Sequence, residues 1–327
     1  MKVLVAGGAV YIGSHTCKAL AEAGHTPIVY DNLHTGHEWA VKWGALERGD
    51  LNDAATLGAV LKKHRPDAVI NFAALAYVGD STRDPNHYYR VNVGGLLTLI
   101  ETMRAHDVGS IVFSSSCATY GVPDRLPIAE GTRQEPINPY GRTKLVGEMM
   151  LRDACAAYGL AVVALRYFNA AGADAAGELG EEHDPETHLI PLVLQAAAGV
   201  RPNISVFGTD YDTPDGTCIR DYIHVTDLAA AHVAALSVCA AGKFSAFNLG
   251  TGSGASINEV ITHACTVTRR NIPVTTAPRR AGDPPRLVAD ASLAATGLGW
   301  RPIHSDPENI IRTAWLWMTE HRKKVVK

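Results

Sequence analysis

The sequence lacks a surplus of positive charge, a long apolar run and paired cysteines. Its 327 residues carry 30 Lys and Arg against 33 Asp and Glu, a formal net charge of −3, whereas proteins that bind a nucleic-acid backbone usually have a basic excess. The longest apolar runs, such as residues 68–78, are interrupted by polar residues and are too short to cross a bilayer. We therefore expect neither nucleic acid nor a membrane as a partner, whereas one small phosphorylated ligand stays possible.

Cysteine is scarce and scattered. No two of the six cysteines form a C-x-x-C pair, so neither a zinc knuckle nor a thioredoxin-type redox site is indicated. The 14 histidines are spread over the chain, and we expect no metal site. Residues 1–6 lead directly into a glycine turn, without the apolar core and cleavage site of a signal peptide. These features predict a reducing, cytoplasmic compartment.

Short β-branched runs alternate with segments of helical periodicity in the first half of the chain. The expected strands cover residues 2–6, 27–30, 68–72, 111–113 and 161–165, and the expected helices cover residues 14–23, 53–64, 88–104 and 140–158. This alternation predicts an α/β fold with a Rossmann-type doubly wound parallel sheet, whose ligands bind beyond the carboxyl ends of the strands.

The pattern changes after Asn169. Residues 170–185 are expected to form a loop, residues 206–221 are rich in turns, and further helices are expected at 189–198, 225–240 and 257–267, before a short helical region at the C-terminus. We predict an NAD-binding domain over residues 1–169 and a smaller α/β substrate domain, mainly over residues 170–327. Segments near residues 220–250, including a strand at 247–249, are expected to return to the main sheet.

The glycine turn at residues 7–13 lies between an expected strand and an expected helix. A helix N-terminus presents free N–H groups that suit a pyrophosphate. Asp31, which ends the second strand, can accept hydrogen bonds from a ribose and would repel a 2′-phosphate, so NAD is favoured over NADP. Val10 stands where a further glycine is expected, and its branched side chain is predicted to crowd the pyrophosphate and weaken cofactor affinity. An ordinary glycine-rich turn is the alternative.

Tyr140 and Lys144 are four residues apart in an expected helix and therefore share one of its faces. A neighbouring ammonium, together with a positive nicotinamide ring, would lower the pKa of the tyrosine from its usual value near 10. Such a tyrosine is a usable general base for a sugar hydroxyl, with Ser116 as a proton relay. By itself, Y-x-x-x-K is more often a tyrosine at a helix start beside a surface lysine.

The chain resembles the extended short-chain dehydrogenases/reductases over nearly its whole length, and among them most closely the UDP-glucose 4-epimerases. The motifs that carry the resemblance are F-S-S-S at 113–116, N-P-Y-G at 138–141, L-R-Y-F-N at 165–169, R-D-Y-I-H-V at 220–225, and A-P-R-R at 277–280 with Gly282 and Asp283. The last three sets are features of enzymes that act on nucleotide sugars.

The glycine turn and the resemblance together imply two sets of binding residues. The NAD set is Gly7, Tyr11, Ile12, Gly13, Asp31, Asn32, Asp50, Leu51, Phe72, Ala73, Asn92, Ser114, Tyr140, Lys144 and Tyr167. The substrate set is Ser116, Tyr140, Asn169, Leu189, Phe207, Arg220, Arg280, Asp283 and Leu287. Arginine suits a diphosphate, although a structural ion pair to Asp221 or Asp227 is an alternative role for Arg220. Ala76 replaces a lysine that several family members carry near the cofactor phosphates.

The activity implied by the resemblance is inversion at C4 of a UDP-hexose through a transient 4-keto sugar, with tightly bound NAD, which interconverts UDP-glucose and UDP-galactose. Helices 88–104 and 140–158 would form the four-helix bundle of a homodimer. Leu287 would favour plain hexoses over N-acetylated ones. The alternatives are an epimerase for N-acetylhexosamine or pentose substrates, a 4,6-dehydratase and a non-catalytic NAD sensor. The dehydratase is disfavoured because no carboxylate follows Ser116 in the sequence Cys117-Ala118-Thr119. The pathway served, galactose use or polysaccharide supply, stays open.

Overall fold

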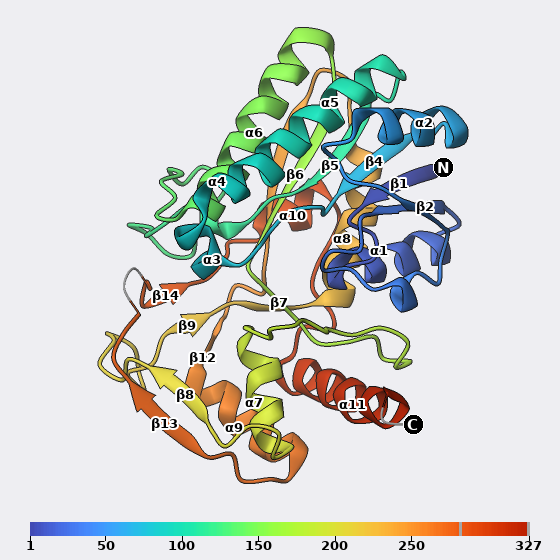
Figure 1. The fold of residues 1–327 in the computed structure, drawn as a ribbon. Coiled ribbons are helices and arrows are strands. Elements are labelled where there is room, and N and C mark those ends of the chain that lie inside the picture. The colour runs from blue at the N-terminus through green and yellow to red at the C-terminus, as the bar shows by residue number, and fades with distance from the viewer. Residues whose placement is uncertain (281–282, 326–327) are drawn as a thin grey trace.

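A computed structural model describes residues 1–280 and 283–325, so Gly282 of the A-P-R-R motif region lies outside the described residues. Its main feature is a seven-stranded sheet in the order β11-β6-β5-β4-β1-β2-β3 (Figure 1), in which neighbouring strands are parallel. The strands are β1 (Lys2–Ala6), β2 (Thr26–Asp31), β3 (Ala45–Arg48), β4 (Ala68–Asn71), β5 (Ser110–Ser114), β6 (Ala161–Tyr167) and β11 (Phe244–Leu249).

Strand order reverses at β1, which has β2 on one side and β4 on the other. In open parallel sheets, the crevice at such a reversal is where a ligand binds. The doubly wound prediction is therefore confirmed, and the strand expected at residues 247–249 returns to the sheet as part of β11, next to β6.

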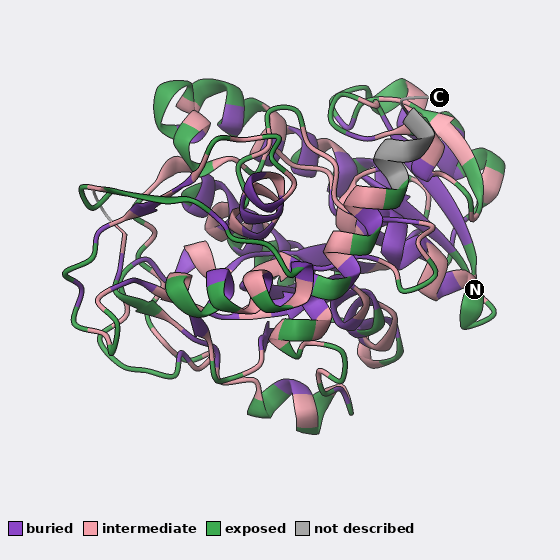
Figure 2. Cartoon of the chain, turned by 90° about the horizontal axis from the view of Figure 1, so that it is seen from below, coloured by how far each residue is buried: buried purple, intermediate pink, exposed green. Residues whose placement is uncertain are grey.

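Helices cover both faces of the sheet, and each face has its own apolar core (Figures 1 and 2). Successive side chains of a strand point to opposite faces: in β1, Leu4 and Ala6 belong to one core, and Val3 and Val5 to the other. The first core is completed by α2 (Ala54–His64), α5 (Gly95–Ala105) and α6 (Pro139–Tyr158), and the second by α1 (Tyr11–Glu22) and α8 (Val225–Val238).

A third apolar core lies in a smaller lobe beyond the carboxyl edge of the sheet. It packs α7 (Leu189–Ala197), α9 (Ile257–Thr268) and α11 (Pro307–Val325) against β8 (Ile204–Phe207). The mostly exposed strand β13 (Val274–Ala277) pairs with β8 in parallel. Short strands connect this lobe to the sheet: β7 (Asn169–Ala171) pairs with β10 (Tyr222–His224), and β9 (Ile219–Arg220) lies between β12 (Ala255–Ser256) and β14 (Arg286–Leu287). The remaining elements are η1 (Glu38–Ala40), α3 (Val78–Arg83), α4 (Pro85–Tyr88), η2 (Tyr89–Gly94), η3 (Cys117–Thr119) and α10 (Ser292–Gly297).

The structure corrects several expected boundaries. The helix expected at 88–104 is divided into α4, the π-helical η2 and α5, a local widening that is common at functional sites. The short C-terminal helical region is the 19-residue helix α11. The first helix begins at Tyr11 instead of residue 14, and the turn-rich stretch at 206–221 contains the end of β8 and β9.

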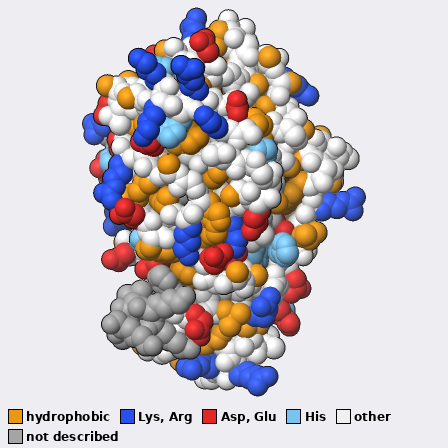
Figure 3. Space-filling view, turned by 90° about the vertical axis from the view of Figure 1, so that its right-hand side faces the viewer, with side chains coloured by type: hydrophobic (Ala, Val, Ile, Leu, Met, Phe, Trp, Pro, Cys, Tyr) orange, Lys and Arg blue, Asp and Glu red, His pale blue; other side chains and the backbone are white. Residues whose placement is uncertain are grey.

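The surface agrees with the modest net charge. On the face drawn in Figure 3, Lys and Arg side chains are interspersed with acidic and apolar ones. Across the residues that the structure describes, no helix is both long and apolar enough to cross a bilayer. All six cysteines are free thiols.

Candidate cofactor and active site

The glycine turn packs tightly against the end of β4. Gly7 has a φ of +74°, and a Cβ there would lie 2.6 Å from the backbone nitrogen of Ala73. A Cβ on Gly13 would lie 2.0 Å from the carbonyl oxygen of Gly7. Only glycine allows the turn, the end of β4 and the start of α1 to approach so closely. The turn therefore brings the N-terminus of α1 to the crevice, as an anion site requires.

Val10 does not strain this turn. Its φ of −83° and ψ of 172° are an ordinary extended conformation, and its side chain packs against the apolar core on the α1 face of the sheet. Because the position has no positive φ, the branched side chain of Val10 does not oppose the backbone conformation of the turn. Val10 acts as the residue before the first turn of α1, and the turn accommodates it.

The ends of β2 and β3 bring three predicted NAD residues together. Asp31 is buried and accepts backbone N–H groups from Ala9 at 2.9 Å and Leu33 at 2.8 Å. Burial raises the pKa of its carboxyl, and these two hydrogen bonds oppose the rise. The Asn32 side chain donates to the Asp50 carboxylate at 2.8 Å. The two side chains therefore form one polar edge beside Asp31, with buried Leu51 next in the chain.

The loop after β4 is held to α6 through Asn92. The backbone N–H groups of Phe72 and Ala73 both donate to the carbonyl oxygen of Ala6, at 2.8 and 3.0 Å. Buried Asn92, in the π-helical η2, accepts from the N–H of Leu75 at 2.8 Å and donates to Leu75 O at 3.0 Å and Thr143 Oγ1 at 2.9 Å. The floor of the crevice is thus tied to the helix that carries Tyr140.

Lys144, Ser114 and Tyr167 form one buried polar group at the ends of β5 and β6. Lys144 Nζ donates to the carbonyl oxygen of Ser114 at 2.7 Å, and the hydroxyls of Ser114 and Tyr167 lie 2.7 Å apart. Because Lys144 is 4% exposed, desolvation lowers its pKa to about 7. The predicted lysine is therefore in place, but its ammonium is directed toward a backbone carbonyl.

Tyr140 lies beside this group, in the first turn of α6. Lys144 Nζ is 5.9 Å from the centre of the Tyr140 ring. Burial raises the pKa of Tyr140, and the nearby Tyr167 adds to the rise, while a hydrogen bond with Ser116 opposes it. The predicted lowering of this pKa depends on the nicotinamide ring as well as on Lys144, so it concerns the chain with NAD bound.

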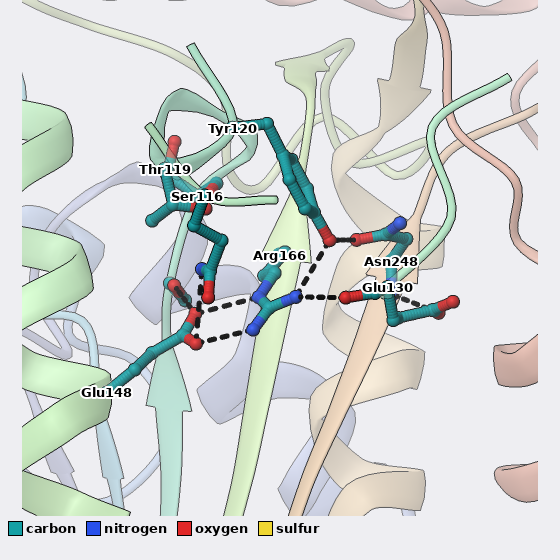
Figure 4. A network of polar contacts seen from close by, with 9 residues as sticks. Ser116, Thr119, Tyr120, Glu130, Glu148, Arg166 and Asn248 are labelled. Carbon is teal, nitrogen blue, oxygen red and sulfur yellow. Dashed lines mark hydrogen bonds and ion pairs between the residues drawn. The ribbon is translucent and has the colours of Figure 1, made fainter. Parts of the chain in front are cut away.

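Behind these residues lies a buried ion pair that sequence reasoning missed (Figure 4). Arg166 in β6 makes two hydrogen bonds to the Glu148 carboxylate in α6, at 2.8 and 2.6 Å. Glu148 also accepts from the Ser115 hydroxyl at 2.6 Å, and Arg166 donates to the Tyr120 hydroxyl, which donates to Asn248 in β11. The network joins the segment carrying Ser116 to the helix carrying Tyr140. An arginine inside the apolar run of β6 was the available signal.

Two arginines of the smaller lobe each contact one neighbouring side chain. Arg220 Nη2 lies 3.3 Å from the Asp283 carboxylate, and the Arg280 guanidinium lies 4.0 Å from the centre of the Phe207 ring. The alternative ion pair between Arg220 and Asp221 or Asp227 is not formed. Asp221 instead accepts backbone N–H groups at Thr251, Gly252 and Ala289, and Asp227 accepts from the segment at residues 303–305.

The remaining predicted substrate residues lie on two different parts of the lobe. Leu287 in β14 is the strand-pairing partner of Arg220 in β9. Its side chain belongs to a small apolar cluster that also contains Phe168 and Cys117, the residue after Ser116. The Asn169 side chain donates to the carbonyl oxygen of Asp221 at 3.0 Å. These residues are therefore brought together, whereas Leu189 starts α7 and packs against the core of the smaller lobe.

Comparison with known proteins gives a single answer for the family. The model of the NAD dependent epimerase/dehydratase family matches residues 3–250. The chain belongs to this family. A curated UDP-glucose 4-epimerase from Rhizobium meliloti is 52% identical over 316 residues, which cover 96% of each chain.

Solved structures agree with the assignment to the epimerase/dehydratase family. A UDP-glucose 4-epimerase from Brucella ovis in complex with NAD has a TM-score of 0.93 and 57% identity, covering 96% of this chain and 97% of that one. A UDP-glucose 4-epimerase from Bifidobacterium longum in complex with NAD⁺ and UDP has a TM-score of 0.94 and 39% identity, covering 98% of this chain and 99% of that one. The cofactor of this family is NAD, and the turn at Gly7, where any Cβ would collide with the chain, fits its pyrophosphate.

Proposed function

We propose that the chain is a UDP-glucose 4-epimerase, which interconverts UDP-glucose and UDP-galactose. The observation that carries this proposal is the buried corner at the carboxyl ends of β5 and β6, where Tyr140 and Ser116 adjoin Lys144. In the smaller lobe, Arg220 supplies a guanidinium suited to a diphosphate. Close relatives with nearly full coverage are UDP-glucose 4-epimerases, which supports the same conclusion.

The NAD residues named from the sequence would hold the cofactor, with the pyrophosphate at the glycine turn and the adenosine ribose at Asp31. When bound there, NAD would supply reversible hydride transfer at C4 of the hexose. Tyr140 takes the proton of the 4-hydroxyl and later gives it back, and Ser116 hydrogen-bonds the same oxygen. Lys144 holds Ser114, and through it Tyr167, in place beside the base.

On the substrate side, Arg220 and Arg280 would bind the diphosphate, while Asn169, Leu189, Phe207 and Asp283 would contact the rest of the UDP group. Asp283 is paired with Arg220 at 3.3 Å, a long contact that a phosphate oxygen can replace. Leu287, beside Cys117, would adjoin the sugar. We place the division between the NAD domain and the substrate domain at residues 169–170, with residues 220–250 shared between them.

The decisive experiment is to incubate the purified chain with UDP-galactose and follow the formation of UDP-glucose. Interconversion without added reductant or net NADH is the expected result. A 4,6-dehydratase would instead accumulate a 4-keto-6-deoxy sugar nucleotide, and a non-catalytic NAD sensor would return the substrate unchanged. Either of these two outcomes contradicts the proposal. UDP-N-acetylglucosamine and UDP-pentoses, assayed in parallel, separate the other epimerase specificities.

We also propose a homodimer built on α5 and α6, in a cytoplasmic setting. The two helices lie side by side on one side of the molecule (Figure 1), and they expose Leu97 at 48% and Met149 at 55%. Large apolar side chains on neighbouring helices are typical of a covered interface. Light scattering of the native chain should give the mass of a dimer, and Leu97→Glu with Met149→Glu should give a monomer. A monomeric native chain would contradict this assembly.

A further inference from the structure

Two histidines and two glutamates meet in the loop that leads into α7. The four side chains, here called the His–Glu cluster, are Glu181, His183, Glu186 and His188. One potential ligand atom from each lies within 4.8 Å of all the others. Their spacing in the sequence is E-x-H-x-x-E-x-H, so a single short loop supplies the whole set.

Two distances within the His–Glu cluster match those of a metal site. His183 Nδ1 lies 3.4 Å from Glu181 Oε1 and 3.5 Å from Glu186 Oε2. Zinc bonds of about 2.0–2.1 Å at tetrahedral angles place neighbouring ligand atoms about 3.4 Å apart. A third contact, His188 Nδ1 to Glu181 Oε1 at 2.6 Å, is shorter and would widen around an ion.

The polar atoms of the cluster face one another in a largely buried setting. The Glu181 side chain is 6% exposed, and its Oε1 lies 2.6 Å from His188 Nδ1 and 3.4 Å from His183 Nδ1. His188 occupies the N-cap position of α7, but its side chain does not cap the helix. Among the described residues, the ion pairs of Glu181 and Glu186 are all with these two histidines.

One ligand is already oriented for coordination. Glu186 Oε1 accepts the backbone N–H groups of Thr187 and His188, both at 2.8 Å, which fixes the carboxylate and leaves Oε2 directed at His183. Hydrogen bonds of this kind hold the ligands of metal sites in position. A cavity of about 200 Å³ adjoins the cluster and is lined partly by Glu181, His183 and Glu186.

We propose that the His–Glu cluster is a structural site for one divalent transition-metal ion, with zinc as the best fit. Two imidazole nitrogens and two carboxylate oxygens suit zinc, whereas calcium and magnesium prefer oxygen ligands throughout. Four protein ligands close the coordination shell, so the ion stabilises the chain and performs no chemistry. At the other end of this loop, the carbonyl oxygen of Gly172 accepts a hydrogen bond from the Tyr11 hydroxyl in α1 at 2.6 Å. An ion at the cluster would therefore fix the second end of a loop whose first end is already held to α1.

The competing arrangement is two protonated histidines paired with two carboxylates and no ion. Metal analysis of the full chain separates the two. The protein is purified without chelator, incubated with Zn²⁺, freed of loose ions by gel filtration and analysed by mass spectrometry of its metals. We expect about one zinc ion per chain, and a melting temperature that falls when EDTA removes it. Zinc below about a tenth of an equivalent per chain would overturn the proposal.

Variants test whether the bound ion sits in this cluster. Glu181→Gln and His183→Ala should each lose most of the zinc, while Glu47→Gln should retain it. Glu47 is a matched control, because its carboxylate also lies 2.6 Å from a histidine, His64, outside any cluster of four ligands. Equal zinc in Glu181→Gln and the wild type would mean adventitious binding and would overturn the proposal.

A titration of the wild type with Co²⁺ keeps the test valid if a variant fails to fold. Tetrahedral Co²⁺ with nitrogen and oxygen ligands gives a visible absorption band that Zn²⁺ abolishes on displacement. We expect that band to saturate at about one Co²⁺ per chain. Absence of the band, or a band that Zn²⁺ leaves unchanged, would contradict a tetrahedral site in this loop.

Discussion

The two walls of the crevice hold their polar side chains in different ways. On the sheet side, the contacts are with fixed backbone or with fully buried partners: Lys144 bonds the Ser114 carbonyl, and Asp31 bonds two backbone N–H groups. On the lobe side, Arg220 makes a long ion pair with Asp283, and exposed Arg280 rests on a phenylalanine ring. Fixed contacts preorganise a site for a resident group, whereas replaceable contacts suit a ligand that exchanges.

This difference predicts where the effects of substitutions will fall. Changes on the sheet side should lower the catalytic rate or the stability of the fold, because they disturb preorganised groups. Changes on the lobe side should alter KM or the choice of substrate.

Tyr140→Phe should have the largest effect on the sheet side. Removing the hydroxyl should lower kcat by a factor of order 10²–10⁴, the usual contribution of a positioned acid or base, while NAD stays bound. The check is kcat for UDP-galactose together with the amount of cofactor released on denaturation. Tyr158→Phe, at the far end of the same helix, is the matched control and should retain full activity. A Tyr140→Phe variant that keeps more than about a tenth of the rate would assign the base to another residue.

Arg166→Met tests the network behind the corner. The change leaves Glu148 buried without its partner, which should lower the free energy of unfolding by about 3–5 kcal/mol. Urea unfolding followed by circular dichroism measures the loss. The double variant Arg166→Met with Glu148→Leu should recover much of it, since no unpaired charge remains. If Arg166→Met alone were as stable as the wild type, the ion pair between Arg166 and Glu148 would not hold the active-site corner in place.

Leu287→Ala probes the lobe side and should change specificity more than rate. An unpartnered acetamide costs about 1–3 kcal/mol to bury, so the wild type should prefer plain UDP-hexoses by roughly tenfold or more over N-acetylated ones. Alanine should reduce this preference by making room. The measurement is kcat/KM for UDP-glucose and UDP-N-acetylglucosamine in both proteins. An unchanged ratio would show that Leu287 serves the apolar cluster alone.

Val10→Gly should have the smallest effect, and it tests whether the Val10 side chain crowds the cofactor on the sheet side. Because Val10 is already relaxed and packed, glycine should leave NAD occupancy unchanged and lower the melting temperature slightly through lost packing and added freedom of the unfolded chain. Cofactor content and thermal melting report both quantities. A rise in NAD occupancy in the glycine variant would mean that the valine side chain does crowd the pyrophosphate.

The elements around the glycine turn could be predicted from sequence because their signals are local. The strand at residues 2–6 is a β-branched run, and the glycines that follow lie directly between it and the start of a helical segment. In contrast, β3 was missed because it is an edge strand that ends in Glu47 and Arg48, so it lacks an apolar pattern. The π-helical η2 was missed because helical periodicity does not distinguish a widened turn.

The partners of site residues were less predictable, because they lie far apart in the sequence. Arg220 and Asp283 are 63 residues apart, and Arg166 and Glu148 belong to different elements. Only the fold brings them together. Helical spacing correctly put Lys144 near Tyr140, but it could not show that the ammonium donates to the Ser114 carbonyl. The His–Glu cluster carries an alternating acid and histidine pattern that a search for paired histidines overlooks.

The position of β11 at the sheet edge has a consequence for how the chain is made. When the ribosome has released the first 169 residues, β6 still has an open edge, and α8 is absent from the face that it covers in the finished protein. An open edge and a bare apolar face both invite pairing with other chains. The sheet is complete only after Phe244–Leu249 has emerged, so about three quarters of the protein must be synthesised before its nucleotide-binding half can reach its native state.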